Sequence, residues 1–457
     1  MGAKVLAHTM RMERDERLAA GLAKVMARAG MGKPSGLARL TGGATMESWR
    51  FEADGEAFVL RRAPSQVMLA DRPFGHDTEA AIIRSAAAKG VSAPEIVVEL
   101  EDDDGIGSGF VMRALPGTPD PKAILAMDEP ERLLSECAAQ LARIHSMGRS
   151  DVPSDVPVMD YREAIAELKD RFQEAGGDRP ILALGLRWLA DNCPEPVEPV
   201  LNHGDYRLGN LLVQDDGLTG VLDWELAHFG DWHEDLAFGC LPVWRFGAYD
   251  KPALGLGSLE DYFDAYEANG GRPVDPARFR FWTIYRMVWW ALGCLKNAQL
   301  WRSGQDRMLE RVVISRRTSE QELDLLLLLE ENASEFDRRS RIEPIRSLND
   351  GYGEADEGEL AIAISEWLGT IKHRLEGHDR FQLAVARNAL GMIARYSDVM
   401  PLVGLVEECD EILEGKRGFE TPGLCKELRE TTLQKVSVDS PKYPSLAVAR
   451  RKWLGDD

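Results

Sequence analysis

Residues 201–236 constrain this 457-residue chain more than any other part of its sequence. Residues 203–205 read His-Gly-Asp, Asn210 follows, and Asp223 comes after a short apolar stretch. Residues 215–217 read Asp-Asp-Gly between two apolar runs, which predicts a small β-hairpin. Such a hairpin would keep Asp205 and Asn210 on one tight loop and return Asp223 towards them.

A carboxylate, an amide and a second carboxylate in this order provide what phosphoryl transfer requires. The Asp205 carboxylate could accept a proton from a hydroxyl group, and the oxygens of Asn210 and Asp223 are ligands that Mg²⁺ prefers. Five fixed letters at fixed spacing arise by chance in a chain of this length with a probability on the order of 10⁻⁴. We therefore set aside the alternative of a surface hairpin with scattered acids.

The H-G-D-Y-R-x-G-N and D-W-E-x-A-x-x-G-D blocks resemble the aminoglycoside phosphotransferase and choline kinase-like family. The branch they resemble most is related to the kinase halves fused to some acyl-CoA dehydrogenases, and the resemblance covers about residues 15–335. It implies an α+β, bilobal, protein-kinase-like fold, with a small antiparallel sheet lobe and a larger helical lobe. It also implies these site residues: Asp205 as the catalytic base, Asn210 and Asp223 as metal ligands, and His203 and Asp235 as braces of the catalytic loop.

Weaker signals in the first part of the chain follow the order that this family requires. Gly42 and Gly43 lie between two predicted strands, where relatives have a glycine-containing loop for nucleotide phosphates. Arg61 takes the place of the kinase lysine and Glu79 that of its ion-pair partner, although Arg62 is a rival for the same role. An exposed charge pair is the alternative interpretation of Arg61 and Glu79.

The resemblance also implies a hinge that contacts adenine through backbone groups. It would run from Met112 to Leu115, with Met112 and Ala114 as the contacts. The implied cofactors are ATP and Mg²⁺, and GTP stays open as an alternative donor.

Three residues near the second block need separate interpretation. Glu225 could reach a second metal ion or be a solvated acid. His233 is expected to pack or cap locally, because no Cys/His cluster accompanies it. Trp232 stands where relatives usually have proline.

Hydrophobic periodicity predicts the surrounding elements. The turn formers at residues 349–354 mark a boundary before three further helical faces, at 360–375, 381–396 and 402–413. We therefore expect a nucleotide-binding lobe at 1–115, a catalytic and substrate lobe at 116–345 and an all-helical C-terminal domain at 350–457. Within the lobes we expect a helix at 17–30, a hairpin within 37–62 turning at Asp54-Gly55, a helix at 78–89, strands near 96–100 and 110–112, and helices at 131–146, 161–174 and 259–301.

Composition narrows the classes of partner. The chain has 55 Lys+Arg and 76 Asp+Glu, a formal charge of −21, which disfavours binding to nucleic acid or to an anionic membrane surface. Six scattered cysteines and the absence of an apolar N-terminal segment predict a cytoplasmic protein.

The acceptor is expected to be the hydroxyl group of a small molecule bound between the Asp205 loop and the helices of residues 259–301. The branch resemblance favours a hydroxyacyl-CoA or another lipid-derived metabolite, whereas the excess of acid favours an aminoglycoside-like antibiotic or an amino alcohol. A catalytically silent scaffold is the alternative from another class, and the C-terminal helices could mediate homo-oligomerisation. The candidate acceptor-site side chains are aromatic, most of them expected to be core, or basic: Tyr285, Trp289, Trp290, Arg280, Arg286 and Lys296.

Overall fold

The computed structural model describes residues 16–40, 46–64, 72–215, 217–340, 342, 357–396 and 406–455. Its contacts divide the chain into two compact units. Unit 1 consists of Met1–Met159, Val197–Gly239 and Leu256–Val274, and unit 2 of Asp160–Pro196, Cys240–Gly255 and Asp275–Asp457. The lobe boundaries expected from the sequence stay a prediction.

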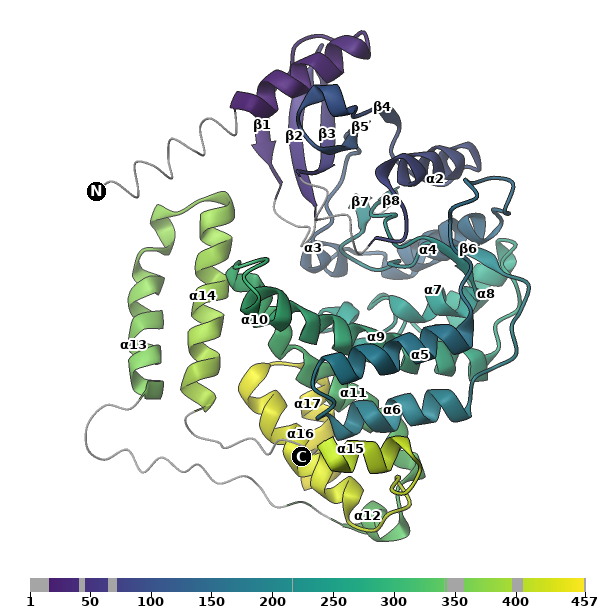
Figure 1. Ribbon diagram of the computed structural model, residues 1–457, viewed down its shortest axis with the longest axis vertical. Coiled ribbons are helices and arrows are strands. Elements are labelled where there is room, and N and C mark those ends of the chain that lie inside the picture. Colours follow the sequence, from purple (N-terminus) through teal and green to yellow (C-terminus); the bar gives the residue numbers. More distant parts are fainter. Residues whose placement is uncertain are drawn as a thin grey trace. The chain divides into compact units, whose positions relative to one another are not determined.

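Unit 1 begins with a five-stranded antiparallel sheet in the order β1-β2-β3-β5-β4 (Figure 1). The predicted hairpin is β2-β3, and Asp54 and Gly55 at its turn have φ angles of 52° and 83°. Positive φ at both central residues is the geometry that suits a two-residue hairpin turn. The strands are β1 (Ser35–Arg39), β2 (Glu47–Ala53), β3 (Glu56–Ala63), β4 (Ile96–Glu99) and β5 (Ser108–Arg113).

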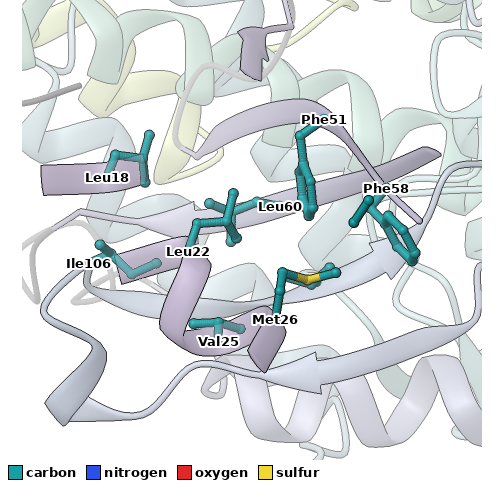
Figure 2. Packing of buried hydrophobic residues seen from close by; sticks show 10 residues of the cluster. Leu18, Leu22, Val25, Met26, Phe51, Phe58, Leu60 and Ile106 are labelled. Atoms are coloured by element: carbon teal, nitrogen blue, oxygen red, sulfur yellow. The ribbon is translucent and has the colours of Figure 1, made fainter. Parts of the chain in front are cut away.

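A helix over residues 16–28 covers one face of this sheet, as its apolar spacing predicts. Figure 2 shows its side chains packed against those of β2 and β3. Leu60 of β3 is fully buried in this core. Because side chains alternate along a strand, Arg61 projects from the opposite face, where it pairs with Glu79 of α2 (His76–Ala88). The core side chains labelled in the figure are Leu18, Leu22, Val25, Met26, Phe51, Phe58, Leu60 and Ile106.

Two small sheets position the motif segment of unit 1. The strand β6 (Val200–Asn202) pairs with β9 (His228–Gly230), and β7 (Leu211–Gln214) pairs with β8 (Gly217–Val221). The second pair is the predicted hairpin. Helices pack against both small sheets. The helix α4 (Pro130–His145) contacts β6, β8 and the helix α8 (Leu259–Ala268), and α7 (Trp232–Phe238) contacts β6. The short helix α3 (Pro121–Leu125) precedes α4.

Unit 2 is helical among its described residues. The prediction of one helical run over 259–301 is wrong between the two helices, because α8 ends at Ala268 and α9 begins at Pro276. Gly270-Gly271 and Pro273 account for the break, since glycine and proline end helices. The helices of unit 2 are α5 (Tyr161–Glu174), α6 (Pro180–Asp191), α9 (Pro276–Arg302), α10 (Leu309–Arg316), α11 (Thr318–Leu329), α12 (Glu335–Arg339), α13 (Glu357–Thr370), α14 (Gly377–Tyr396), α15 (Val406–Leu413), α16 (Leu424–Asp439) and α17 (Pro444–Leu454).

The three predicted faces correspond to α13, α14 and α15, but the first was expected to reach residue 375 and α13 ends at Thr370. Leu402 and Leu405 of the third face lie outside the described residues. The helices α16 and α17 were not predicted. Both pack against α11, whose acidic side chains are buried. Lys435 of α16 pairs with Glu322, and the Tyr443 hydroxyl donates to Asp324. In the part of the chain that the structure describes, no helix combines the length and hydropathy required to cross a bilayer.

Candidate active site

The loop between β6 and β7 carries the predicted catalytic base. The Asn210 amide donates hydrogen bonds to Asp205 Oδ2, at 2.6 Å, and to the Asp205 carbonyl oxygen, at 3.0 Å. The Arg207 guanidinium pairs with Asp205 Oδ1 at 2.7 Å. Burial raises the pKa of Asp205 even though the Arg207 cation opposes the shift. Asp205 is therefore a fixed carboxylate with greater proton affinity than a solvated aspartate.

Asp235 of α7 holds this loop from behind. Its two carboxylate oxygens accept the backbone N–H groups of His203, at 2.5 Å, and Gly204, at 2.8 Å. Its Oδ2 also lies 3.3 Å from Nε2 of His145. Burial alone would raise its pKa, but these hydrogen bonds and the nearby histidines lower the pKa of Asp235 to about 2. The observed contacts agree with the predicted bracing role.

Gly204 is required by the backbone of the same loop. Its φ is +81°, and a Cβ atom there would lie 2.3 Å from the Leu226 carbonyl oxygen. A side chain would meet both backbone strain and a clash, so only glycine fits between the histidine and the aspartate.

The His203 side chain links the two halves of the site. Its Nδ1 accepts the Asp205 backbone N–H at 3.2 Å, so its Nε2 carries the proton that is donated to the Leu222 carbonyl oxygen at 3.1 Å. Burial lowers the pKa of His203, which agrees with this neutral tautomer. His203 therefore ties the Asp205 loop to the residue that precedes Asp223.

Asp223 reaches the same region from the end of β8. Its φ of 69° is unusual for a residue other than glycine. The preceding residue, Leu222, donates its backbone N–H to the Asn210 carbonyl oxygen at 2.8 Å, which joins the end of β8 to the loop of Asn210. Although burial opposes the shift, the Arg61 and Arg207 guanidiniums hold the pKa of Asp223 below its usual range. The structure thus brings Asp205, Asn210 and Asp223 together within unit 1.

Arg61 connects the sheet to this site. Its Nη2 lies 2.5 Å from Asp223 Oδ1, and its Nε lies 3.2 Å from Glu79 Oε1. The Arg61 and Glu79 side chains are 12% and 1% exposed, so the interpretation as an exposed charge pair is wrong. The rival, Arg62, pairs with Glu47 at 2.7 Å on the other face of β3.

Glu225 is neither exposed nor unpaired. Its Oε2 lies 2.8 Å from Arg61 Nη2, so the interpretation as a solvated acid is wrong. Burial and the nearby Asp223 carboxylate raise the pKa of Glu225 to about 7. His233 is fully buried with its Nδ1 2.6 Å from Asp231 Oδ1, as expected for a local packing role.

Two arginines of the site were missed from the sequence. Arg207 lies inside the motif and could have been found by its proximity to Asp205. Arg72 follows a segment without periodicity, so no pattern identifies it. Its Nη2 lies 2.5 Å from Glu79 Oε2 and its Nε 3.9 Å from Glu225 Oε2, while its buried Nη1 has no hydrogen-bond partner among the described residues.

A profile of the phosphotransferase enzyme family matches residues 36–282, which are 247 of the 457 residues. The chain belongs to the phosphotransferase enzyme family. Acyl-CoA dehydrogenase family member 10 of Mus musculus is 31% identical over 236 residues, 47% of this chain and 22% of that protein. Family member 11 of Gallus gallus is 28% identical over 236 residues, 48% of this chain and 29% of that protein. The chain therefore covers less than a third of either relative.

A solved structure shows the same fold. A Ralstonia eutropha protein described as an aminoglycoside phosphotransferase superimposes with a TM-score of 0.55 at 20% identity, over 68% of this chain and 98% of that chain. The predicted family and the α+β, protein-kinase-like fold with a helical C-terminal region are thus confirmed. The predicted phosphotransferase is confirmed at the level of family membership.

Asn210 and Asp223 are the candidate ligands for a hard cation that also binds phosphate. Among the described residues, no group of three or more His, Cys, Asp or Glu side chains could hold a metal ion by itself. Asn210 and Asp223 offer one amide and one carboxylate, and Mg²⁺ is commonly held by one or two carboxylates together with substrate phosphates. The Arg61 guanidinium lies 2.5 Å from Asp223 Oδ1, so this carboxylate accepts a positively charged partner here.

The expected nucleotide contacts are described only in part. Gly42 and Gly43 lie outside the described residues. Met112 pairs with Val59 and Ile96 inside the sheet. The Ala114 N–H donates to the Ala57 carbonyl oxygen at 2.9 Å, so this N–H is not available to the adenine base of a nucleotide. The contact of Ala114 with adenine stays a prediction.

The basic and aromatic side chains of α9 mostly serve packing in unit 2. Arg280 pairs with Glu331 at 2.6 Å, and the Arg286 guanidinium lies 4.9 Å from the centre of the Trp289 ring. Tyr285 is buried, and the Trp290 ring lies 5.0 Å from the Trp244 ring at an interplanar angle of 51°. Trp289 and Trp290 are half-buried, so of the three candidate aromatics only Tyr285 belongs to the buried core. The acceptor site stays a prediction.

Proposed function

We propose that this phosphotransferase moves the γ-phosphoryl group of ATP to a hydroxyl group of a small molecule. The observation that supports the proposal most is the convergence of Asp205, Asn210 and Asp223 within one braced loop. Asn210 fixes the Asp205 carboxylate at 2.6 Å, and Asp235 fixes the backbone on which Asp205 lies. Phosphoryl transfer depends on positioning and charge neutralisation more than on covalent chemistry.

In this mechanism Asp205 orients the acceptor hydroxyl group and accepts its proton. Arg207 shares the Asp205 carboxylate and would place positive charge beside the transferred group. The Nη2 atom of Arg61 would turn from Asp223 to the nucleotide phosphates, while Glu79 keeps its contact with Arg61 Nε. Mg²⁺ bound by Asn210 and Asp223 would supply further neutralisation of the phosphate charge.

We propose a hydroxyacyl-CoA or a related lipid-derived metabolite as the acceptor. The support is that the curated relatives are named as acyl-CoA dehydrogenase family members, in which the matched part is a minority of the chain. A hydroxyl group on an acyl thioester would suit as acceptor in proteins whose remaining part belongs to the acyl-CoA dehydrogenase family. The six cysteines form no disulfide, which agrees with the cytoplasmic location that we propose.

A radiolabelled transfer assay tests the proposal. Purified chain would be incubated with Mg²⁺, labelled ATP or GTP, and either hydroxyacyl-CoA compounds of several chain lengths or aminoglycosides and amino alcohols. We expect label on a hydroxyacyl compound with ATP as donor. Label on an aminoglycoside alone would contradict the acceptor class, and no transfer to any acceptor together with no nucleotide binding would favour the silent scaffold.

Substitution of the base provides the matched test. Asp205→Asn should lower the transfer rate by about 10²–10⁴-fold, because a positioned general base contributes a factor of this size. Binding of ATP should persist, and the exposed Asp103→Asn variant should retain full activity. Turnover of Asp205→Asn at the wild-type rate would remove Asp205 from the mechanism.

A further inference from the structure

His145, the last residue of α4, is a buried histidine with a partner at each ring nitrogen. Its Nε2 lies 3.3 Å from Asp235 Oδ2, and its Nδ1 lies 2.7 Å from the Tyr266 hydroxyl oxygen. Because the pKa of Asp235 is about 2, its carboxylate is ionised and only accepts, so Nε2 carries the proton of that hydrogen bond. In the neutral ring Nδ1 then accepts the Tyr266 O–H. The two hydrogen bonds therefore run in one direction, from Tyr266 through His145 to Asp235.

Tyr266 lies on α8, which packs against α4, and its neighbours fix its position. The side chain is fully buried, and its ring lies edge-on to the His145 ring with the centroids 5.5 Å apart. After α8 the backbone turns closely over the same ring, where a Cβ atom on Gly271 would lie 2.4 Å from a ring carbon. The Gly271 N–H also donates to the Tyr266 carbonyl oxygen at 2.9 Å. The hydroxyl group thus has a fixed place from which it orients the imidazole.

The helix α4 holds the loop between β6 and β7 at two points. One is the contact of His145 with Asp235, whose oxygens accept the two backbone N–H groups that come directly before Asp205. The other is the Cys137 carbonyl oxygen, which accepts the Tyr206 hydroxyl at 2.8 Å. Tyr206 follows Asp205 in the chain. The helix α4 therefore restrains the backbone on both sides of the candidate base.

We propose, on the basis of the proposed function, that His145 and Tyr266 are positioning residues for phosphoryl transfer. They orient the Asp235 carboxylate, which fixes the backbone on which Asp205 lies. Neither side chain needs to touch the nucleotide or the acceptor. Because phosphoryl transfer depends on the exact position of the base, a looser loop lowers the rate of transfer more than it weakens the binding of ATP.

The substitution Tyr266→Phe removes only the hydroxyl group and tests this role in the full chain. With labelled ATP, Mg²⁺ and a hydroxyacyl-CoA acceptor, kcat should fall about fivefold, the effect of one hydrogen bond, while KM for ATP changes little. Hydrogen exchange measured by mass spectrometry should become about fivefold faster at the His203 and Gly204 amides, and exchange in α17 should stay unchanged. Tyr443→Phe is the matched control, because it removes a hydroxyl that donates to a buried carboxylate of unit 2, and it should change neither kcat nor exchange in the loop.

Two substitutions of the histidine separate positioning from packing. His145→Gln keeps an N–H group for Asp235, whereas His145→Leu keeps only apolar volume, so the glutamine variant should retain the higher kcat and the slower exchange in the loop. The reverse order would show that His145 only fills space and would overturn the proposal, as would unchanged kcat and exchange in Tyr266→Phe. A wild-type chain that transfers no label to a hydroxyacyl-CoA contradicts the proposed function, and the exchange rates then decide by themselves whether these two side chains hold the loop.

Discussion

At the scale of single residues, two arginines, Arg61 and Arg72, join three carboxylates in one part of the site. Arg61 contacts Asp223, Glu225 and Glu79, and Arg72 contacts Glu79 and lies near Glu225. The same Nη2 atom of Arg61 contacts Asp223 and Glu225, so a turn of this atom towards a nucleotide would also break the contact with Glu225. Because Arg72 offers a second cation to Glu79 and Glu225, it lowers the cost of that movement.

The role of Arg72 can be tested by nucleotide binding. Arg72→Met should weaken binding of MgATP about tenfold, or about 1.4 kcal/mol, because Arg61 would remain the only cation beside Glu79 and Glu225. Arg72→Lys should recover part of the affinity. Titration calorimetry measures the effect, with Arg84→Met on α2 as a control, since Arg84 pairs with Glu99 at the surface. Equal affinities of wild type and Arg72→Met would exclude the role.

At the scale of elements, α11 shows why the C-terminal helices are part of unit 2. Its buried acids contact Lys435 of α16 and Tyr443, which precedes α17. The same pattern continues at Glu330, just after α11. Arg429 of α16 pairs with Glu330 at 2.8 Å, and the two side chains are 6% and 3% exposed. A buried acid without its partner is strongly destabilising, so the helices and the acids depend on one another.

Removal of the arginine should show this dependence. Arg429→Met should destabilise the protein by about 3 kcal/mol, which corresponds to a melting temperature lower by about 5 °C or more. The added substitution Glu330→Gln should recover part of the loss, because it removes a buried carboxylate that keeps only Lys452 as a cationic partner among the described residues. Arg450→Met on the exposed side of α17 is the control and should change the melting temperature little. An unchanged melting temperature of Arg429→Met would show that the pair is dispensable.

At the scale of the whole molecule, the net charge of −21 includes carboxyl groups that are not at the surface. Asp324 of α11 is one of them, 3% exposed and hydrogen-bonded by the Tyr443 hydroxyl. Burial raises the pKa of Asp324 to about 7 from an ordinary value of 3.8. The folded state therefore keeps this proton over a pH range in which the unfolded chain has released it.

This difference makes stability depend on pH with a defined sign. Between pH 4 and 7 the unfolded chain binds fewer protons at this position, so stability falls as pH rises, by about 4 kcal/mol at most. Asp324→Asn should remove that part of the slope and raise the melting temperature at pH 8 relative to wild type. Asp410→Asn, at an exposed position of α15, should leave the slope unchanged. Parallel pH profiles of wild type and Asp324→Asn would contradict the prediction.

Local patterns determined much of this protein from its sequence alone. Strand alternation and the Asp54-Gly55 turn predicted the β2-β3 hairpin, and the spacing from His203 to Asp223 predicted one site, because short-range geometry fixes both. Only the tertiary structure decided between Arg61 and Arg62, since the choice depends on which face of β3 the helix at residues 16–28 covers. It also decided the places of Arg72 and Glu225, because contacts between residues distant in the chain leave no periodic signal.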